Sequence, residues 1–138
     1  MVMISDGEDI AVGEAAAAAD TSERCLFYDP ALGGVPGCAA LEYMAQTMAL
    51  AVGCRARRAG VAPKRGYVLG SRRLEITLPV FRRDGKYRVH AKCAYTDEEF
   101  ASFDCTISEA GGDIVASAAL TAFQPSDNET PERKENPK

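Results

Sequence analysis

A glutamate stands inside an otherwise uncharged stretch and is the first candidate for chemistry. Residues 34–53 read GVPGCAALEYMAQTMALAVG, and Glu42 is the single charged residue among them. Apolar residues recur there every three or four positions, which predicts a helix from about residue 37 to residue 59. Glu42 is either a general acid–base group or a capping-box glutamate, and its position beyond the N3 residue that a capping box uses weighs against the cap. The opposite face of the helix is nearly as apolar, and we therefore expect Glu42 to be buried.

Three residues around Glu42 have types that suit the same site. Gly37, after Pro36, stands at the predicted helix start, where free amides polarise a carbonyl oxygen; a plain helix-start glycine is the alternative. Cys38 is either a reactive thiol or, as we favour, a packing residue. Gln46 shares the helix face of Glu42 and either orients its carboxylate or is a tolerated polar residue at an interface.

Length and composition restrict the class of protein. The chain has 138 residues, of which 46% are hydrophobic, enough for one domain with its own core. Its five cysteines are scattered and its single histidine is His90, so we expect no metal site, no cofactor and no disulfide framework. No apolar run approaches the ~20 residues that span a bilayer. We expect a cytoplasmic protein without a membrane span.

The order of predicted elements indicates an α+β fold. A short apolar run at 2–5, a strand at 10–20 and an ordered loop at 21–36 precede the helix. Four strands, at about 66–80, 86–95, 100–108 and 114–123, follow it and are joined by hairpin-type turns. This pattern predicts an antiparallel four-strand meander in a sheet that is wrapped around one long central helix and buries it from both sides. Residues 1–124 form the domain, and residues 125–138 are expected to be a disordered tail.

The helix motif resembles that of the hotdog-fold 3-hydroxyacyl-[acyl-carrier-protein] dehydratases. Pro36 and Gly37 open the helix, Glu42 takes the family's acid position, and Tyr-Met-Ala-Gln follows at 43–46. The chain is most similar to the divergent dehydratase-like branch associated with aryl polyene gene clusters. The resemblance implies dehydration of 3-hydroxyacyl thioesters in fatty-acid or polyene and polyketide biosynthesis, without a cofactor.

The resemblance also implies roles for individual residues. Glu42, Tyr28 and Gly37 take the catalytic positions, but Tyr28 stands where the family has its histidine, fourteen residues before the acid. A phenol is a poor base near neutral pH, so Tyr28 is limited to donating a hydrogen bond or passing a proton through water. No family role maps onto His90. The expected substrate-binding residues are Cys38, Gln46, Tyr67, Leu69 and Gly70, the last three on a strand that lines the family's acyl tunnel.

Three functions stay open on these grounds. The first is a dehydratase of acyl thioesters, and the second is a hotdog thioesterase, which uses the helix acid to activate water. The third is a non-catalytic partner subunit that completes the site of another hotdog protein. A dimer is expected in each case, either a homodimer or a heterodimer, because an isolated sheet leaves a strand edge open.

Positive charge is concentrated in one part of an acidic chain. Residues 55–88 contain eleven of the sixteen Lys and Arg residues and two acidic residues, although the net charge of the chain is −4. The segment is either a solvated face or a docking surface for an acidic acyl carrier protein. Nucleic acid is not expected as a partner, because no recognition motif is present. The residues that we expect to dock the carrier are Arg72, Arg73, Arg82 and Arg83.

Overall fold

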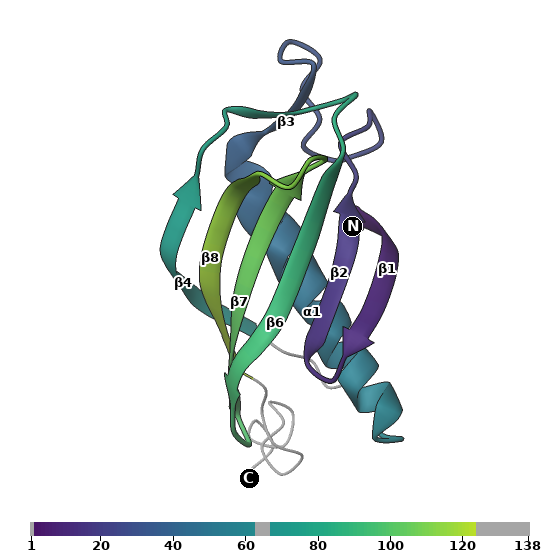
Figure 1. The fold of residues 1–138 in the computed structure, drawn as a ribbon, viewed down its shortest axis with the longest axis vertical. Helices are drawn as coiled ribbons and strands as arrows, with labels where there is room; N and C mark the ends of the chain where they lie inside the picture. The colour runs from purple at the N-terminus through teal and green to yellow at the C-terminus, as the bar shows by residue number, and fades with distance from the viewer. Residues whose placement is uncertain (1, 63–66, 124–138) are drawn as a thin grey trace, which may run out of the picture.

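The computed structural model describes residues 2–62 and 67–123, which form one antiparallel sheet and one long helix (Figure 1). The described parts confirm the predicted α+β class. The helix has a short 3₁₀ turn, η1 (Gly37–Ala39), followed by α1 (Ala40–Arg58). A separate two-stranded ribbon pairs β3 (Gly34–Pro36) with β5 (Val80–Arg82). The six strands of the main sheet lie in the order β1 (Ile4–Ala11), β2 (Glu14–Ala19), β6 (Tyr87–Thr96), β7 (Phe100–Glu109), β8 (Ile114–Phe123) and β4 (Tyr67–Ile76).

Buried and exposed side chains alternate along β6, so one face of the sheet forms the core with α1. Tyr87, Val89 and Ala91 are buried on the face that packs against α1, whereas Arg88 and Lys92 are exposed on the other face. The period-two pattern is the one expected of a sheet with one covered face. The bounds of β6, β7 and β8 lie within one residue of the predicted strands.

The helix begins and ends as its sequence predicts. Tyr43, Met44, Met48 and Ala51 are buried on the face that meets the sheet. Gly60 follows the last turn with a positive φ of 74°, and its N–H donates to the carbonyl of Arg57, a left-handed C-terminal cap that glycine adopts without strain.

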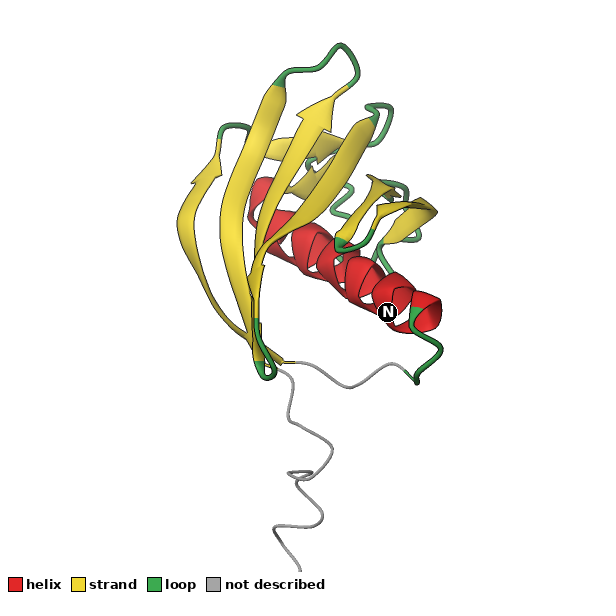
Figure 2. Cartoon of the chain, turned by 60° about the horizontal axis from the view of Figure 1, so that its bottom comes forward, coloured by secondary structure: helices red, strands yellow, loops and turns green. Residues whose placement is uncertain are grey.

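The prediction that the sheet buries the helix from both sides is wrong for this chain by itself. Figure 2 shows the strands curving around one side of α1 and leaving the other side uncovered. Glu42 and Ala49 are exposed on that outer side, and Ala45, Gln46 and Gly53 are only half-buried. One sheet of this width covers one helix face, so no element of residues 2–62 and 67–123 covers the apolar outer face.

The predicted four-strand meander is also wrong, because β4 pairs with β8 rather than with β6. The predicted strand 66–80 ends at Ile76, and Pro79, which has no N–H to give to a ladder, follows in the crossover. The chain then runs across the start of the helix, where β5 pairs with β3, before β6 begins. Only β6, β7 and β8 form a meander.

The strand predicted at 10–20 proves to be part of a hairpin. β1 and β2 are antiparallel, and a turn at Val12 and Gly13, with φ of 79° at the glycine, separates them. The tail predicted to be disordered, 125–138, lies outside the described residues. Within the described ranges, no helix is long and apolar enough to cross a membrane.

Candidate functional site

Glu42 and Gln46 form a hydrogen-bonded pair on the uncovered side of α1. They lie four residues apart, and Gln46 Nε2 donates to Glu42 Oε2 at 3.1 Å. Gln46 Oε1 in turn accepts the backbone N–H of Met3 at 2.7 Å. Glu42 is exposed, which corrects the expectation that it is buried, because the sheet lies on the opposite side of the helix. Its carboxylate therefore faces whatever covers this side of the protein.

The start of the helix is held by the crossover that carries Pro79. The N–H of Gly37 donates to the carbonyl oxygen of Pro79 at 2.8 Å. A Cβ on Gly37 would lie 2.3 Å from the carbonyl oxygen of Leu78, so this close approach requires glycine. The sequence predicts that the Gly37 amide polarises a carbonyl oxygen of the substrate. That expectation is corrected, since its N–H already donates to a protein carbonyl. Cys38 is exposed and follows Gly37 in the chain. Its backbone N–H is the next one at the N-terminus of the helix.

Tyr28 belongs to the loop that leads from β2 to the helix. The start of this loop is fixed, because the hydroxyl of the buried Tyr43 donates to the carbonyl of Asp20 at 2.9 Å. Burial above all raises the pKa of Tyr43 above its ordinary value, so this phenol stays a donor. The hydrogen bond from the Ser22 side chain lowers the pKa of the Asp20 carboxyl. Tyr28 itself is half-buried against the core, and its hydroxyl has no hydrogen bond with any described residue.

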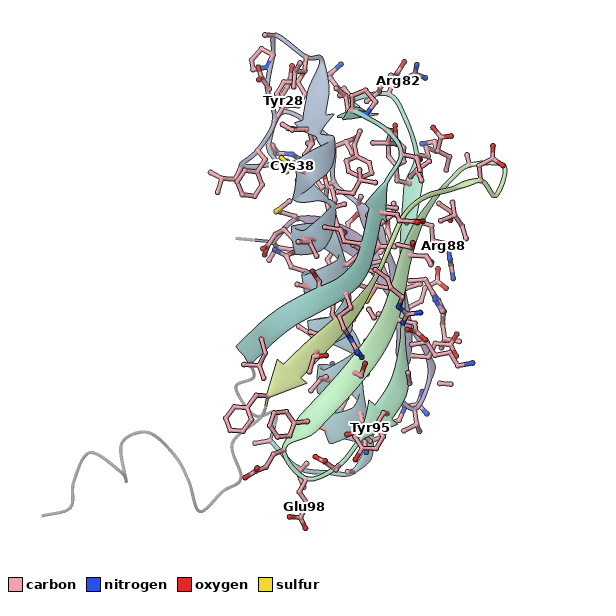
Figure 3. The ribbon with its side chains drawn as sticks, turned by 90° about the vertical axis from the view of Figure 1, so that its left-hand side faces the viewer. Tyr28, Cys38, Arg82, Arg88, Tyr95 and Glu98 are labelled. Atoms are coloured by element: carbon pink, nitrogen blue, oxygen red, sulfur yellow. The ribbon has the colours of Figure 1, made fainter. Side chains whose placement is uncertain are left out.

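The predicted site residues fall into two groups in space. Figure 3 shows Tyr28, Cys38 and Arg82 at the end of the molecule where the helix begins. Leu69 and Gly70 lie instead near the start of β4, the edge strand beyond β8, and both are exposed. The backbone of Tyr67 pairs with Phe123, and its side chain lies outside the described part. A single chain therefore does not bring β4 together with Glu42.

The arginines expected to dock a carrier do not form one cluster. Arg82 pairs with Gly34 in the β3–β5 ribbon, and the N–H of Arg83 donates to the carbonyl of Gly33, so both adjoin the helix start. Arg72 and Arg73 lie on β4. Three of the four have an exposed acidic neighbour: Arg73 with Asp104 at 3.7 Å, Arg82 with Asp84 at 3.8 Å, and Arg83 with Glu23 at 3.5 Å. Exposed pairs of this kind are weak and leave the guanidinium groups accessible.

His90 is remote from the helix pair. It alternates on β6 with Val89 and Ala91, which face the helix, so its ring lies on the opposite face of the sheet. Its Nε2 lies 2.6 Å from Glu14 Oε2. The single histidine of the sequence thus has a structural partner on the sheet. Among the residues the structure describes, no His, Cys, Asp and Glu side chains are grouped as metal ligands.

The cysteines differ in accessibility, which gives a direct test of the site's geometry. Cys38 is exposed, Cys25 and Cys105 are buried, and burial raises the pKa of Cys105 to about 12. Since the thiolate is the reactive form, iodoacetamide at pH 8 should alkylate Cys38 first and leave Cys105 unmodified in the native protein. Peptide mass spectrometry after short exposures measures this order. Alkylation of Cys105 as fast as Cys38 would contradict the structure.

Comparisons with known proteins identify the family. The family described as ApeP-like, ApeP dehydratase, matches residues 1–132. The chain belongs to the ApeP-like family. The resemblance to hotdog dehydratases that the helix motif indicates is thereby confirmed. A search of curated protein sequences gives no match.

Solved structures share the fold of this ApeP-like chain at low sequence identity. The dehydratase heterocomplex ApeI:P from Xenorhabdus doucetiae matches with a TM-score of 0.83 and 23% identity over 99% of this chain and 90% of that one. A hypothetical thioesterase with coenzyme A from Streptococcus pneumoniae matches with a TM-score of 0.67 and 18% identity, over 88% and 85% of the two chains. Thioesterase HI1161 from Haemophilus influenzae has a TM-score of 0.67 and 17% identity, over 91% and 82%. These matches confirm the hotdog fold.

Two features of the site have no signal in the sequence. The N–H of Gly37 is occupied only because a carbonyl from the later crossover reaches it. The bond from Met3 to Gln46 joins residues 43 positions apart. Neither contact follows from local spacing, because both depend on how distant segments pack.

Proposed function

We propose that this ApeP-like protein is one subunit of a hotdog dehydratase that acts on 3-hydroxyacyl thioesters, with Glu42 as its acid–base group. The observation that carries the proposal is the Glu42–Gln46 pair, which lies on the side of α1 that none of the described strands covers. Small uncharged residues, Ala45, Ala49 and Gly53, continue that helix face. A second hotdog subunit seated there would exclude water from the carboxylate and complete the site.

Dehydration requires two proton transfers and a hydrogen-bond donor that stabilises negative charge on the thioester oxygen. A base takes the α-proton, the bond between C3 and oxygen breaks, and a carboxylic acid gives its proton to the departing hydroxyl to form water. Glu42 suits the second role, because Gln46 holds one carboxyl oxygen and leaves the other for the substrate. The amide of Cys38, at the helix start, is placed to donate to the thioester oxygen while it carries negative charge.

The base is best supplied by a different subunit. His90 is held by Glu14 on the far face of the sheet, and Tyr28 is a poor base near neutral pH. A heterodimer with a hotdog subunit that carries the family's loop histidine would place an imidazole opposite Glu42. The related ApeI:P dehydratase is a heterocomplex, which supports this assembly. The thioester would arrive on an acyl carrier protein.

One assay separates dehydration from hydrolysis and from a purely structural role. The chain is incubated alone and with a histidine-bearing hotdog dehydratase, using a 3-hydroxyacyl and a 2-enoyl thioester, while free thiol and the enoyl chromophore are followed. We expect enoyl chemistry in the mixture and no thiol release. Thiol release would identify a thioesterase, and a mixture no more active than the partner alone would mean that the chain contributes nothing to the dehydrating site.

Tyr28→Phe should lower turnover less than loss of Glu42 does, by about threefold to tenfold, because it removes one hydrogen-bonding hydroxyl and no charge. The hydroxyl has no described hydrogen-bond partner, so folding should be unaffected. Steady-state kinetics and thermal melts of the variant measure the two effects. A loss as large as that of the Glu42 variant would make Tyr28 the principal proton donor.

Charge reversal at Arg82 and Arg83 should slow turnover of carrier-linked substrate and leave a short soluble thioester almost unaffected. Both arginines adjoin the helix start, where the carrier's arm would enter, and rim charges mainly set the rate of association. Reversal of Arg72 and Arg73 on β4 is the matched control for net charge. Equal losses on both substrates would exclude docking at Arg82 and Arg83, and equal effects of the two pairs would indicate general electrostatic attraction.

A further inference from the structure

The backbone of Met3 lies between the two parts of the chain that carry the candidate site. Its carbonyl oxygen accepts the backbone N–H of Asp20 at 2.8 Å, and its N–H donates to Gln46 Oε1 at 2.7 Å. The Met3 side chain is fully buried in the same core cluster as Tyr43 and Met44. Two hydrogen bonds and a buried side chain therefore fix the backbone of Met3 in place.

The Met3 N–H determines which way the Gln46 amide faces. A backbone N–H only donates, so Gln46 must turn its oxygen toward Met3 and its NH₂ group away from it. The NH₂ group then donates to Glu42 Oε2 at 3.1 Å. Were the amide flipped, two donors would meet at Met3 and an oxygen would face the Glu42 carboxylate.

The backbone of Met3 also holds the loop that leads to Tyr28. Asp20, whose N–H binds Met3, begins this loop, and its own carbonyl accepts the Tyr43 hydroxyl at 2.9 Å. Tyr43 is the neighbour of Glu42 on the helix. The start of the loop and the acid-bearing turn of α1 thus share Met3 as a common support.

We propose that the backbone of Met3 is a positioning element of the active site, acting through Gln46 on the carboxylate of Glu42. The inference rests on the proposed catalytic role of Glu42. Met3 touches no reacting atom, so its effect should be on turnover rather than on substrate affinity. The segment before β1 is, on this account, part of the site and not only part of the sheet.

Met3→Pro tests the proposal, because proline removes the N–H and keeps the carbonyl that binds Asp20. Met3 precedes β1, a position at which proline is tolerated. Met3→Leu keeps both backbone groups and a buried apolar side chain. Met3→Ala is the matched control for proline, since it keeps the N–H but also loses most of the buried side chain. In the complex with the histidine-bearing subunit, we expect kcat of Met3→Pro to be about tenfold below those of both Met3→Leu and Met3→Ala, with KM unchanged.

The Gln46→Met background shows whether Met3 acts through Gln46. If it does, Met3→Pro causes no further loss of kcat in that background, because the bond is already absent. Equal activity of the proline and leucine variants, or additive losses in the double variant, would overturn the proposal.

NMR of the isolated full chain separates this proposal from the proposed function. The Gln46 side-chain NH₂ resonances should shift in Met3→Pro and stay in place in Met3→Leu, whether or not the protein turns over substrate. If Met3→Pro does not fold, hydrogen exchange of the Met3 amide decides: we expect protection in the wild type and about tenfold faster exchange in Gln46→Met. Equal exchange in the two proteins, or unmoved NH₂ resonances, would refute the contact.

Discussion

Glu42→Gln lowers the turnover of a 3-hydroxyacyl thioester by about a hundredfold or more, the scale of lost acid–base catalysis. Glutamine keeps the size and the hydrogen-bonding oxygen of the side chain but has no acidic proton to give to the departing hydroxyl. Glu42 is exposed, so the free energy of unfolding should change by less than about 1 kcal/mol. Steady-state kinetics of the complex and denaturant unfolding of the chain measure the two quantities.

Glu14→Gln is the matched control for that variant. Glu14 is also a hydrogen-bonded glutamate, but it pairs with His90 on the face of the sheet that points away from α1. Its replacement should leave turnover within about twofold of the wild type, since surface changes of this kind alter energies by only a few tenths of a kcal/mol. Full activity of Glu42→Gln, or equal losses in both variants, would move the chemistry away from the helix pair.

Addition of a histidine-bearing hotdog subunit raises dehydration by the chain by about a hundredfold or more, because a positioned base contributes on that scale. The expectation follows from where the structure places the two candidate bases, His90 on the far face of the sheet and Tyr28 as a phenol. The rate of dehydration is measured for the chain alone, for the partner alone and for their mixture, each at the same protein concentration. An isolated chain as active as the mixture would mean that Tyr28 suffices.

The sequence predicts the elements well where the signal is local. The period of Tyr87, Val89 and Ala91 predicts β6, and Gly60 predicts the end of the helix, because each pattern depends on neighbours in the chain. The pairing of β4 with β8 is not predictable in this way, since strands 66–80 and 86–95 are adjacent in sequence and a hairpin is the simpler expectation. Long-range pairing is decided by how the crossover passes the helix start.

The candidate site shows the same division. Glu42 and Gln46 are identifiable from a polar pair in an apolar helix, and the structure brings them into contact. Their exposure is not predictable, because an exposed apolar helix face that binds another protein has the same residue types as a buried one. The occupied amide of Gly37 depends on Pro79, which is distant in sequence. The sequence therefore identifies the candidate catalytic residues, but it does not predict whether they are buried or exposed.

The central claim is that Glu42 of this chain and a histidine of a partner subunit form one dehydrating site. Its most direct test is a complementation assay with two complexes, one joining Glu42→Gln to the wild-type partner and the other joining the wild-type chain to a partner whose own helix acid is replaced. Formation of enoyl thioester is measured at equal complex concentration. We expect the first complex to lose turnover by about a hundredfold and the second to retain it. Retention in the first complex and loss in the second would show that Glu42 is not the acid of the site.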